Sequence, residues 1–303
     1  MTTVREQHLV GLDYLDGVTA LLRRVRNAHP TAGLYQAAEL QWWWRTSRST
    51  DELPQLFWFD DHGLPTAAMI ATDFGDGSSA VFEAPTLSLI VLPDASHDWV
   101  AHVIERGLAH AATCGFGTVD LEVDRVDEPV HELLSGCGFV RKGDGLAVGW
   151  LATDERPDVS PLPDGYRLQT RAETMERPHH FGRRSGPRTE ERLLQTSLYR
   201  SDLDLVVHDS HGDVGAYGLF WFDPATATGV VEPMRTEDAH QRRGLARHIL
   251  TAGIDRLAAA GAERISIGWE PDNLASGRLY RSVGFEPVLW TEVLSGSTAR
   301  RTA

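Results

Sequence analysis

Apolar and polar positions in the second half of the chain follow two different periods, which predicts an α+β fold. Short runs rich in β-branched and aromatic residues indicate strands at residues 205–208, 214–221, 229–234, 264–269 and 285–293. Apolar residues that recur near every fourth position predict a helix over residues 244–260, and Gly261 stands where a C-cap glycine belongs. Asp272 or Asn273 can cap a further helix that runs toward Ser282.

The chain also repeats itself. Gly115 and Gly138 recur 146 residues later as Gly261 and Gly284. A period of this length is too long for a solenoid and indicates a tandem duplication of one domain. We expect a first domain at residues 1–152 and a second at residues 163–295. The Pro-rich, acidic residues 153–162 predict a linker, and residues 296–303 predict a disordered tail.

Composition narrows the class of protein. A hydrophobic content of 42% and a charged content of 24% are ordinary for a soluble globular protein. The formal net charge of −14 argues against nucleic acid or an anionic membrane as partner, because both require a basic face. Cys114 and Cys137 indicate neither a disulfide framework nor a zinc site. Because we find no signal peptide and no apolar run long enough to span a bilayer, we expect a cytoplasmic protein.

A short basic segment at the start of the 244–260 helix is the strongest chemical signal. Residues 241–247 read Gln-Arg-Arg-Gly-Leu-Ala-Arg. The first turn of a helix offers unpaired N–H groups and a positive dipole end, which suit a diphosphate. Gly244 lets the backbone approach phosphate oxygens, and Arg242, Arg243 and Arg247 add positive charge. The alternative is an ordinary basic helix start.

Two further residues follow in the next predicted helix. Asn273 and Tyr280 are seven positions apart, about two helical turns, so both face one side of the helix. For either residue alone, a capping Asn or a core Tyr is the better interpretation. Their order after the basic loop favours a shared role.

These segments together resemble the GNAT superfamily of N-acetyltransferases. In that family a Gln/Arg-x-x-Gly-x-Gly/Ala loop holds the pyrophosphate of acetyl-CoA, and Gln241, Gly244 and Ala246 match it. The resemblance implies that Asn273 contacts the CoA arm and that Tyr280 lies near the thioester sulfur. It is strong over residues 228–288, and it implies two tandem GNAT-type domains, each a mixed, mostly antiparallel sheet flanked by helices.

The resemblance also implies a splayed pair of strands that admits the pantetheine like an added strand. The backbone of residues 231–235 is expected to bind it, and the Met234 N–H is the candidate to polarise the thioester carbonyl. The expected acetyl-CoA contacts are Met234, Arg235, Thr236, Gln241, Arg242, Arg243, Gly244, Leu245, Ala246, Arg247, Asn273, Ser276 and Tyr280.

Direct transfer of the acetyl group follows as the expected mechanism. Tyr280 is the candidate acid for the departing thiolate, because a phenol with a pKa near 10 stays protonated at pH 7. Glu232 is the candidate base for the amine, with Glu270 as second choice and water as a further alternative. For either carboxylate, a solvated or salt-bridged strand residue is an equally good interpretation.

The first half of the chain lacks the counterparts of the expected acetyl-CoA-binding and catalytic residues. The shift of 146 residues places Ala95 at the position of Gln241, Asp98 at Gly244 and Leu134 at Tyr280. An acidic residue repels a diphosphate, and Leu cannot donate a proton. We therefore expect a degenerate domain without an acetyl-CoA site, serving as structural support, as a pocket wall or in oligomer contacts.

Two other segments stand out. Trp42, Trp43 and Trp44 cannot all face one side of an element, so we expect at least one to be exposed. Core and inter-domain packing is the favoured interpretation, and an aromatic-lined amine pocket is the alternative.

Residues 178–188 hold Arg183, Arg184 and Arg188, which suit an acidic group on the acceptor or a solvated loop. His179 and His180 lack a matching partner elsewhere in the sequence, so we expect no metal site.

The expected activity is transfer of an acetyl group from acetyl-CoA to the primary amine of a small molecule, in a ternary complex and without a metal. A protein or peptide N-acetyltransferase and a non-catalytic acetyl-CoA-binding protein are the alternatives. A monomer and a homodimer are both compatible with the sequence, and the acceptor is not identified by it.

Overall fold

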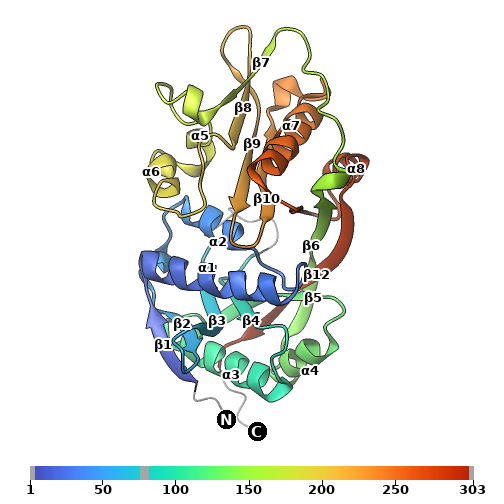
Figure 1. The fold of residues 1–303 in the computed structure, drawn as a ribbon. Helices are drawn as coiled ribbons and strands as arrows, with labels where there is room; N and C mark the ends of the chain where they lie inside the picture. Colours follow the sequence, from blue (N-terminus) through green and yellow to red (C-terminus); the bar gives the residue numbers. More distant parts are fainter. Residues whose placement is uncertain (1–3, 76–81, 300–303) are drawn as a thin grey trace. The chain divides into compact units, whose positions relative to one another are not determined.

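The structure is a computed structural model that describes residues 4–75 and 82–299. It divides into two compact units (Figure 1). The first unit comprises residues 1–40, 47–146 and 289–303, and the second comprises residues 41–46 and 147–288. Among the described residues, no helix has the length and apolar character needed to cross a membrane.

Both halves of the sequence run through the same order of elements: strand, two helices, three strands, helix, strand, helix, strand. In the first half these are β1 (Arg5–Leu9), α1 (Gly11–Ala28), α2 (Ala37–Trp44), β2 (Gln55–Phe59), β3 (Pro65–Thr72), β4 (Thr86–Val91), α3 (His97–Thr113), β5 (Thr118–Asp124), α4 (Glu128–Gly136) and β6 (Val140–Ala152).

In the second half they are β7 (Tyr166–Thr170), α5 (Gly182–Ser185), α6 (Thr189–Leu193), β8 (Asp204–Asp209), β9 (Val214–Asp223), β10 (Thr228–Thr236), α7 (Leu245–Ala260), β11 (Arg264–Trp269), α8 (Leu274–Ser282) and β12 (Glu286–Ser297). Short 3₁₀ turns lie at Ser49–Glu52, Thr153–Glu155, Arg171–Glu173 and Asp238–His240. The predicted α+β class and the internal repeat are confirmed.

Each unit is built on one mixed sheet. The strand order is β1-β2-β3-β4-β5-β12 in the first unit and β7-β8-β9-β10-β11-β6 in the second. The neighbours pair antiparallel except for β4 with β5 and β10 with β11, which are parallel. The same order in both units agrees with a duplication of one domain.

The two halves exchange their last strands. Residues 291–297 of β12 pair with β5 in the first unit, and residues 147–152 of β6 pair with β11 in the second. Leu294 of β12 is accordingly a buried member of the core of the first unit. The units therefore do not follow the expected division at residues 152 and 163, because each sheet is closed by a strand from the other half of the chain.

The two ends of the second domain also differ from expectation. Thr153 N donates to Glu263 O at 3.0 Å and Ser160 N donates to Thr251 Oγ1 at 3.0 Å, so the predicted linker is tied to the second unit. The predicted disordered tail begins too early, because Gly296 and Ser297 pair with β5. Residues 300–303 lie outside the described residues.

Helices cover both faces of the second sheet. Alternating residues of β9 point to opposite faces, and Phe220 packs so closely on α7 that a Cβ at Gly253 would lie 2.0 Å from its ring. A glycine inside a helix costs about 1 kcal/mol relative to alanine, and here it permits this close packing. On the other face, Tyr217 contacts Phe181 at the start of α5. The face of the sheet with Tyr217 also carries His180, which contacts the Tyr217 ring.

Candidate active site

A gap opens between β10 and β11 in the second unit. The two strands pair only at residues 228–231 of β10, although β10 continues to Thr236 and β11 continues to Trp269. The register of β10 against β9 shifts between Val231 and Met234. Within the described residues, β10 beyond Val231 therefore has a strand partner on the β9 side alone. This is the geometry expected of a sheet that accepts an extended ligand as an added strand.

Met234, Arg235 and Thr236 lie along this unpaired stretch, in register with Gly218, Tyr217 and Ala216 of β9. The Thr236 hydroxyl is buried and has no hydrogen-bond partner among the described residues. The predicted pantetheine contacts are thus on the expected strand. In an antiparallel pair, successive residues alternate between bonding the partner strand and facing away from it. Some backbone N–H and C=O groups of residues 234–236 therefore bond β9, and the others face the gap.

The basic loop lies between the 3₁₀ turn at Asp238–His240 and α7. Arg242 has φ of +61° and Gly244 has φ of +84°, so two left-handed residues turn the chain into the helix. A glycine adopts this conformation without a steric penalty. An added Cβ at Gly244 would meet nothing within 4 Å, so the glycine is explained by its backbone conformation and not by close packing.

The first turn of α7 has no side-chain cap. Its N–H groups therefore remain open to an external acceptor, as a phosphate site at a helix N-terminus requires. Gln241, Arg242, Arg243 and Gly244 are exposed, Leu245 is buried, and Ala246 and Arg247 are half-buried.

The three arginines of the loop are held to different degrees. Arg243 donates to Ala239 O at 3.3 Å, and Arg247 donates to Ser282 Oγ at 2.7 Å. Arg242 makes no hydrogen bond or ion pair with another described residue. Two carboxylates, Glu237 and Asp238, lie on the preceding segment and pair with Arg235 at 3.4 and 3.5 Å. The loop therefore carries positively charged arginine side chains, and two carboxylates lie in the segment just before it.

Asn273 and Ser276 mark the start of α8. Asn273 is the N-cap residue, and its side-chain oxygen accepts from Ser276 N at 3.2 Å. The Ser276 hydroxyl donates to Asn273 O at 2.9 Å. The capping interpretation of Asn273 therefore holds in the structure. Among the described residues the side-chain NH₂ of Asn273 has no hydrogen-bond partner, and that group is the one able to donate to a ligand.

Tyr280 is a buried residue of α8 with 8% of its surface exposed. Its ring packs edge-on against Trp269 at 5.7 Å and Phe285 at 6.4 Å between centroids. Burial, and secondarily the charge of Glu232, raise the pKa of the phenol above its ordinary value. Tyr280 therefore remains a proton donor throughout the neutral pH range.

Glu232 lies on β10 where the gap begins. Burial raises the pKa of its carboxyl, while the charge of Arg45 and a hydrogen bond from Trp42 lower it. The backbone carbonyl of Glu232 accepts from Trp221 Nε1 at 2.7 Å, which fixes this part of the strand. Glu232 and Tyr280 interact electrostatically across the second unit. The charge of Glu232, the predicted base, thus acts on Tyr280, the predicted acid, and both roles stay predictions.

Trp42 and Arg45 reach this site from the first half of the sequence. Both belong to the second unit, in which the Arg45 guanidinium stacks on the Trp42 ring at 3.7 Å. Arg45 Nε also donates to Ser185 Oγ at 3.1 Å, and Trp42 packs on Phe181 at 5.2 Å. The sequence analysis singled out the three tryptophans but did not connect them with Glu232.

The expectation that one tryptophan is exposed was wrong. Trp42 and Trp44 are 5% and 7% exposed, and Trp43 is half-buried. Trp44 Nε1 donates to Gln195 Oε1 at 2.9 Å, so this ring also packs on the second unit. Docking of residues 41–46 into that unit buries rings that a helix alone leaves in solvent.

The remaining candidates have other partners. All three arginines of this group are exposed; Arg184 pairs with Glu237 at 3.2 Å and Arg188 with Glu191 at 2.8 Å, whereas Arg183 has no ion pair among the described residues. Glu270 is half-buried and lies between β11 and α8. Of the two carboxylates, Glu232 is the one whose charge raises the pKa of Tyr280.

The corresponding positions of the first unit differ in kind. Leu134 is fully buried in the apolar core, and Asp98 lies exposed in the first turn of α3. The helix caps also show that Ser96, and not Asp98, is the counterpart of Gly244. Because the Ser96 side chain accepts from Trp99 N, the first turn of α3 is already capped.

Comparisons with known proteins agree with this geometry. Residues 165–285 match the model of the Acetyltransferase (GNAT) family. A search of curated proteins found no match.

Three solved structures illustrate the fold. A tandem GNAT protein from the clavulanic acid biosynthesis pathway is 14% identical with a TM-score of 0.69, and the alignment covers 99% of this chain and 100% of that one. A GCN5-related N-acetyltransferase from Sphaerobacter thermophilus is 15% identical with a TM-score of 0.61, over 99% and 97% of the two chains. A glucosamine N-acetyltransferase region of a fungal multi-domain β-N-acetylglucosaminidase is 14% identical with a TM-score of 0.56, over 98% of this chain and 38% of that one. At these identities the likeness concerns the fold.

Proposed function

We propose that the protein transfers the acetyl group of acetyl-CoA to the primary amine of a small molecule, because residues 165–285 match the model of the Acetyltransferase (GNAT) family. The observation that carries the proposal is that Glu232 lies on β10 where this strand separates from β11, and that its charge raises the pKa of the buried Tyr280. An acid and a base placed beside an open strand edge are what amine acetylation requires.

Acetyl-CoA fits the residues of this gap. The open first turn of α7, with Arg242, Arg243 and Arg247, would hold the pyrophosphate. The backbone at Met234 and the neighbouring Arg235 and Thr236 would hold the pantetheine, and Asn273 and Ser276 would contact the CoA arm. When bound, the cofactor supplies the acetyl group as a thioester.

The side chains then divide the proton transfers between them. Glu232 accepts a proton from the amine, so that the nitrogen lone pair can attack the thioester carbonyl. The pKa of Glu232, raised by burial, makes its carboxylate a stronger base than an exposed one. Tyr280 donates its phenolic proton to the departing sulfur. Holding both reactants in one site contributes much of the rate.

A small acceptor is favoured by the surroundings of Glu232. Trp42, which packs on Phe181, donates a hydrogen bond to this carboxylate, and an aromatic neighbour of this kind suits a compact amine better than a protein chain. Two of the similar structures belong to a small-molecule biosynthesis pathway and to a glucosamine N-acetyltransferase region. We further propose that the first half lacks an acetyl-CoA site, because Ser96 caps α3 and Leu134 replaces the tyrosine.

The test is acetyl-CoA-dependent thiol release over a panel of small amines, amino sugars and peptides, combined with calorimetric titration by acetyl-CoA. We expect release with a small amine and one acetyl-CoA bound per chain. Release with peptides alone would replace the small-molecule assignment by a protein N-acetyltransferase. Binding without release from any acceptor would favour a non-catalytic acetyl-CoA-binding protein, and two molecules bound per chain would contradict the role given to the first half.

A further inference from the structure

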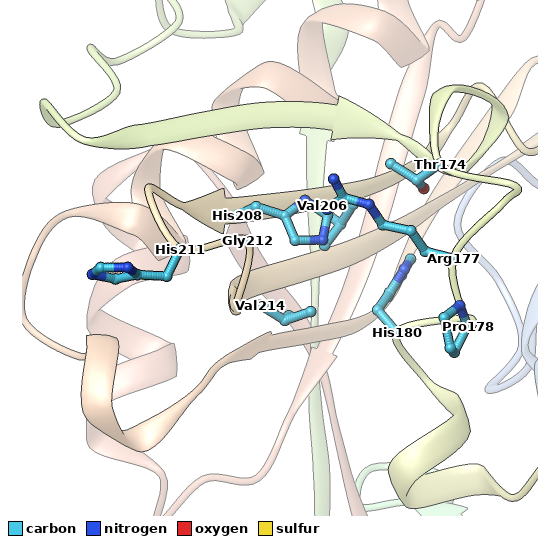
Figure 2. Close-up of a pocket in the computed structure, with 9 residues that line it drawn as sticks. All are labelled: Thr174, Arg177, Pro178, His180, Val206, His208, His211, Gly212 and Val214. Atoms are coloured by element: carbon cyan, nitrogen blue, oxygen red, sulfur yellow. The ribbon is translucent and has the colours of Figure 1, made fainter.

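A cavity of about 370 Å³ lies in the second unit between the loop that follows β7 and the hairpin of β8 and β9 (Figure 2). It is lined by Thr174, Arg177, Pro178, His180, Val206, His208, His211, Gly212 and Val214. Its volume falls in the range of pockets that take small molecules, about 300–1,000 Å³. Among the described residues that line it, none is acidic, and none belongs to the expected acetyl-CoA contacts.

The ionisable side chains of the lining are one arginine and three histidines. His208 on β8 is 7% exposed, and its Nδ1 is buried without a hydrogen-bond partner. A buried polar atom without a partner is costly, and in native proteins such atoms commonly face a ligand, ion or water. Burial, followed by the charges of Arg177 and His180, lowers the pKa of His208. Carboxylates outside the lining act on these groups, since Glu176 Oε1 lies 3.6 Å from Arg177 Nε and the charge of Asp209 raises the pKa of His208, whereas the lining itself holds basic and neutral side chains.

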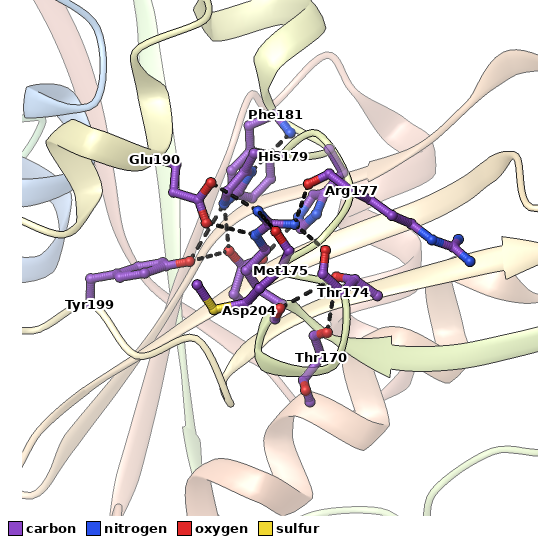
Figure 3. Close-up of polar contacts among 11 residues, drawn as sticks. Thr170, Thr174, Met175, Arg177, His179, Phe181, Glu190, Tyr199 and Asp204 are labelled. Carbon is purple, nitrogen blue, oxygen red and sulfur yellow. Dashed lines mark hydrogen bonds and ion pairs between the residues drawn. The ribbon is translucent and has the colours of Figure 1, made fainter.

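His180 is fixed by a buried carboxylate behind it. Its Nε2 lies 2.9 Å from Oδ1 of Asp204, which is fully buried. The other oxygen of Asp204 accepts from Tyr199 OH at 2.8 Å and lies 3.1 Å from His179 Nε2 (Figure 3). The approach of His180 Nε2 to Asp204 lacks hydrogen-bond geometry, but it places the imidazole of His180 against this carboxylate at the wall of the cavity.

The loop on the other side of the cavity is fixed by Arg171. This buried guanidinium binds both oxygens of Glu190 at 2.8 Å and also donates to the carbonyls of Thr174 and Arg177, the latter at 2.9 Å (Figure 3). The backbone that carries Arg177 is therefore held by a charged network that is itself buried. The cavity is preformed, which lowers the entropic cost of binding.

We propose that this cavity binds a small organic anion with a phosphate or carboxylate group. Arg177 and the imidazoles of His180 and His208 would hold the anionic group, and Val206 and Val214 would contact the organic part. Arginine suits both kinds of anion because its planar fork matches two oxygens at once. The inference does not depend on the proposed acetyl transfer.

A metal ion is a weaker interpretation of the neighbouring cluster. His179, His180 and Asp204 offer ligand atoms within 4.8 Å of one another, a convergence that their sequence spacing did not reveal. However, Phe181 N donates to His179 Nδ1 at 3.2 Å, so the ring proton of neutral His179 lies on Nε2 and faces Asp204. Metal-bound histidines usually show the opposite arrangement, in which the second nitrogen donates.

The test is titration of the full chain with inorganic phosphate, glycerol 3-phosphate and succinate, followed by calorimetry and by the imidazole signals of His208 and His211 in NMR spectra. We expect at least one of these anions to shift both signals. A shift with the two phosphates would identify the anionic group as a phosphate, and a shift with succinate would identify it as a carboxylate. Arg177→Gln should weaken this binding by about tenfold or more, the effect of one charge-assisted hydrogen bond. The Arg177 side chain is 46% exposed, so the variant should fold normally.

Arg242→Gln is the matched control, because it removes an exposed arginine from the loop before α7. It should leave the binding detected at His208 and His211 unchanged. Loss of binding in Arg242→Gln but not in Arg177→Gln would assign the anion to that loop and overturn the proposal. Absence of any shift at millimolar concentrations would overturn it too, as would stoichiometric binding of Zn²⁺ at His179 and His180 that is insensitive to Arg177→Gln.

Discussion

Tyr280 and Glu232 are ionisable side chains that lose much of their water on folding, and burial moves both pKa values upward. The same shift serves opposite roles. It keeps the phenol protonated as an acid, and it brings the carboxylate closer to the pH at which an amine must be deprotonated. The charge of Glu232 also raises the pKa of Tyr280, which favours the protonated phenol.

Tyr280→Phe tests the acid. The change removes one hydroxyl and keeps the ring that packs on Trp269 and Phe285. We expect kcat to fall about 100-fold, within the usual range for a general acid, with little change in KM for acetyl-CoA. Steady-state kinetics measure both, and thermal unfolding checks the fold. An unchanged kcat would remove the role given to Tyr280.

Trp42→Phe tests the base through its hydrogen bond. Because the Trp42 N–H stabilises the charged form of Glu232, its loss should raise the pKa of the carboxyl further. A base acts only when deprotonated, so the acidic limb of the kcat/KM profile should move to higher pH. Trp44→Phe is the control, since Trp44 donates to Gln195 instead. Equal shifts in the two variants would assign the effect to packing.

At the scale of elements, the two long helices that follow a parallel strand differ in how they begin. α3 starts at a serine that caps its own first turn, whereas α7 starts at Gly244 in the left-handed region with no side-chain cap. An internal cap and an external phosphate compete for the same N–H groups. The difference between the two helix starts therefore supports the proposal that a phosphate group binds at α7 and not at α3.

Gly244→Ala and Gly261→Ala form a matched pair on α7. Both glycines are left-handed, with φ of +84° at the N-cap and +104° at the C-cap. Each change should cost about 1–2 kcal/mol in the free energy of unfolding, because a Cβ is unfavourable in this conformation. Gly244→Ala should in addition weaken acetyl-CoA binding, measured by calorimetry at equal folded fraction. Equal affinity in the two variants would contradict a phosphate site at Gly244.

Local signals explain what could be predicted from the sequence. The basic loop, the cap at Asn273 and the apolar period of α7 each lie within a few residues, and short-range spacing encodes them. The contact of Trp42 with Glu232, the docking of His179 and His180 on Asp204, and the partner of β12 join distant segments. Alternating residues indicate that a segment is a strand but not which strand lies beside it, so these features required the tertiary structure.

At the scale of the whole molecule, the exchanged strands tie the two halves together. The sheet of the first unit includes β12, and the sheet of the second unit includes β6. Residues 41–46, from the first half of the chain, also belong to the second unit. A half produced alone would expose an unpaired strand edge and an uncovered apolar surface, both of which promote aggregation.

Separate production of residues 1–158 and 159–303 tests this dependence. We expect neither fragment to unfold cooperatively by itself, and the two to associate when they are produced together. The control is the full chain cleaved once between residues 158 and 159, which should stay associated in size-exclusion chromatography. Cooperative unfolding of either fragment near the midpoint of the intact protein would show that its sheet closes without the exchanged strand.

The exchange of strands also sets an order of events at the ribosome. β5 has left the exit tunnel long before residues 291–297, its partners in the sheet, have been translated. The first unit must therefore keep an open edge for as long as the second half takes to make, a period in which chaperones can bind it. In the second unit the order is reversed, because β6 has been synthesised before its partner β11 leaves the exit tunnel.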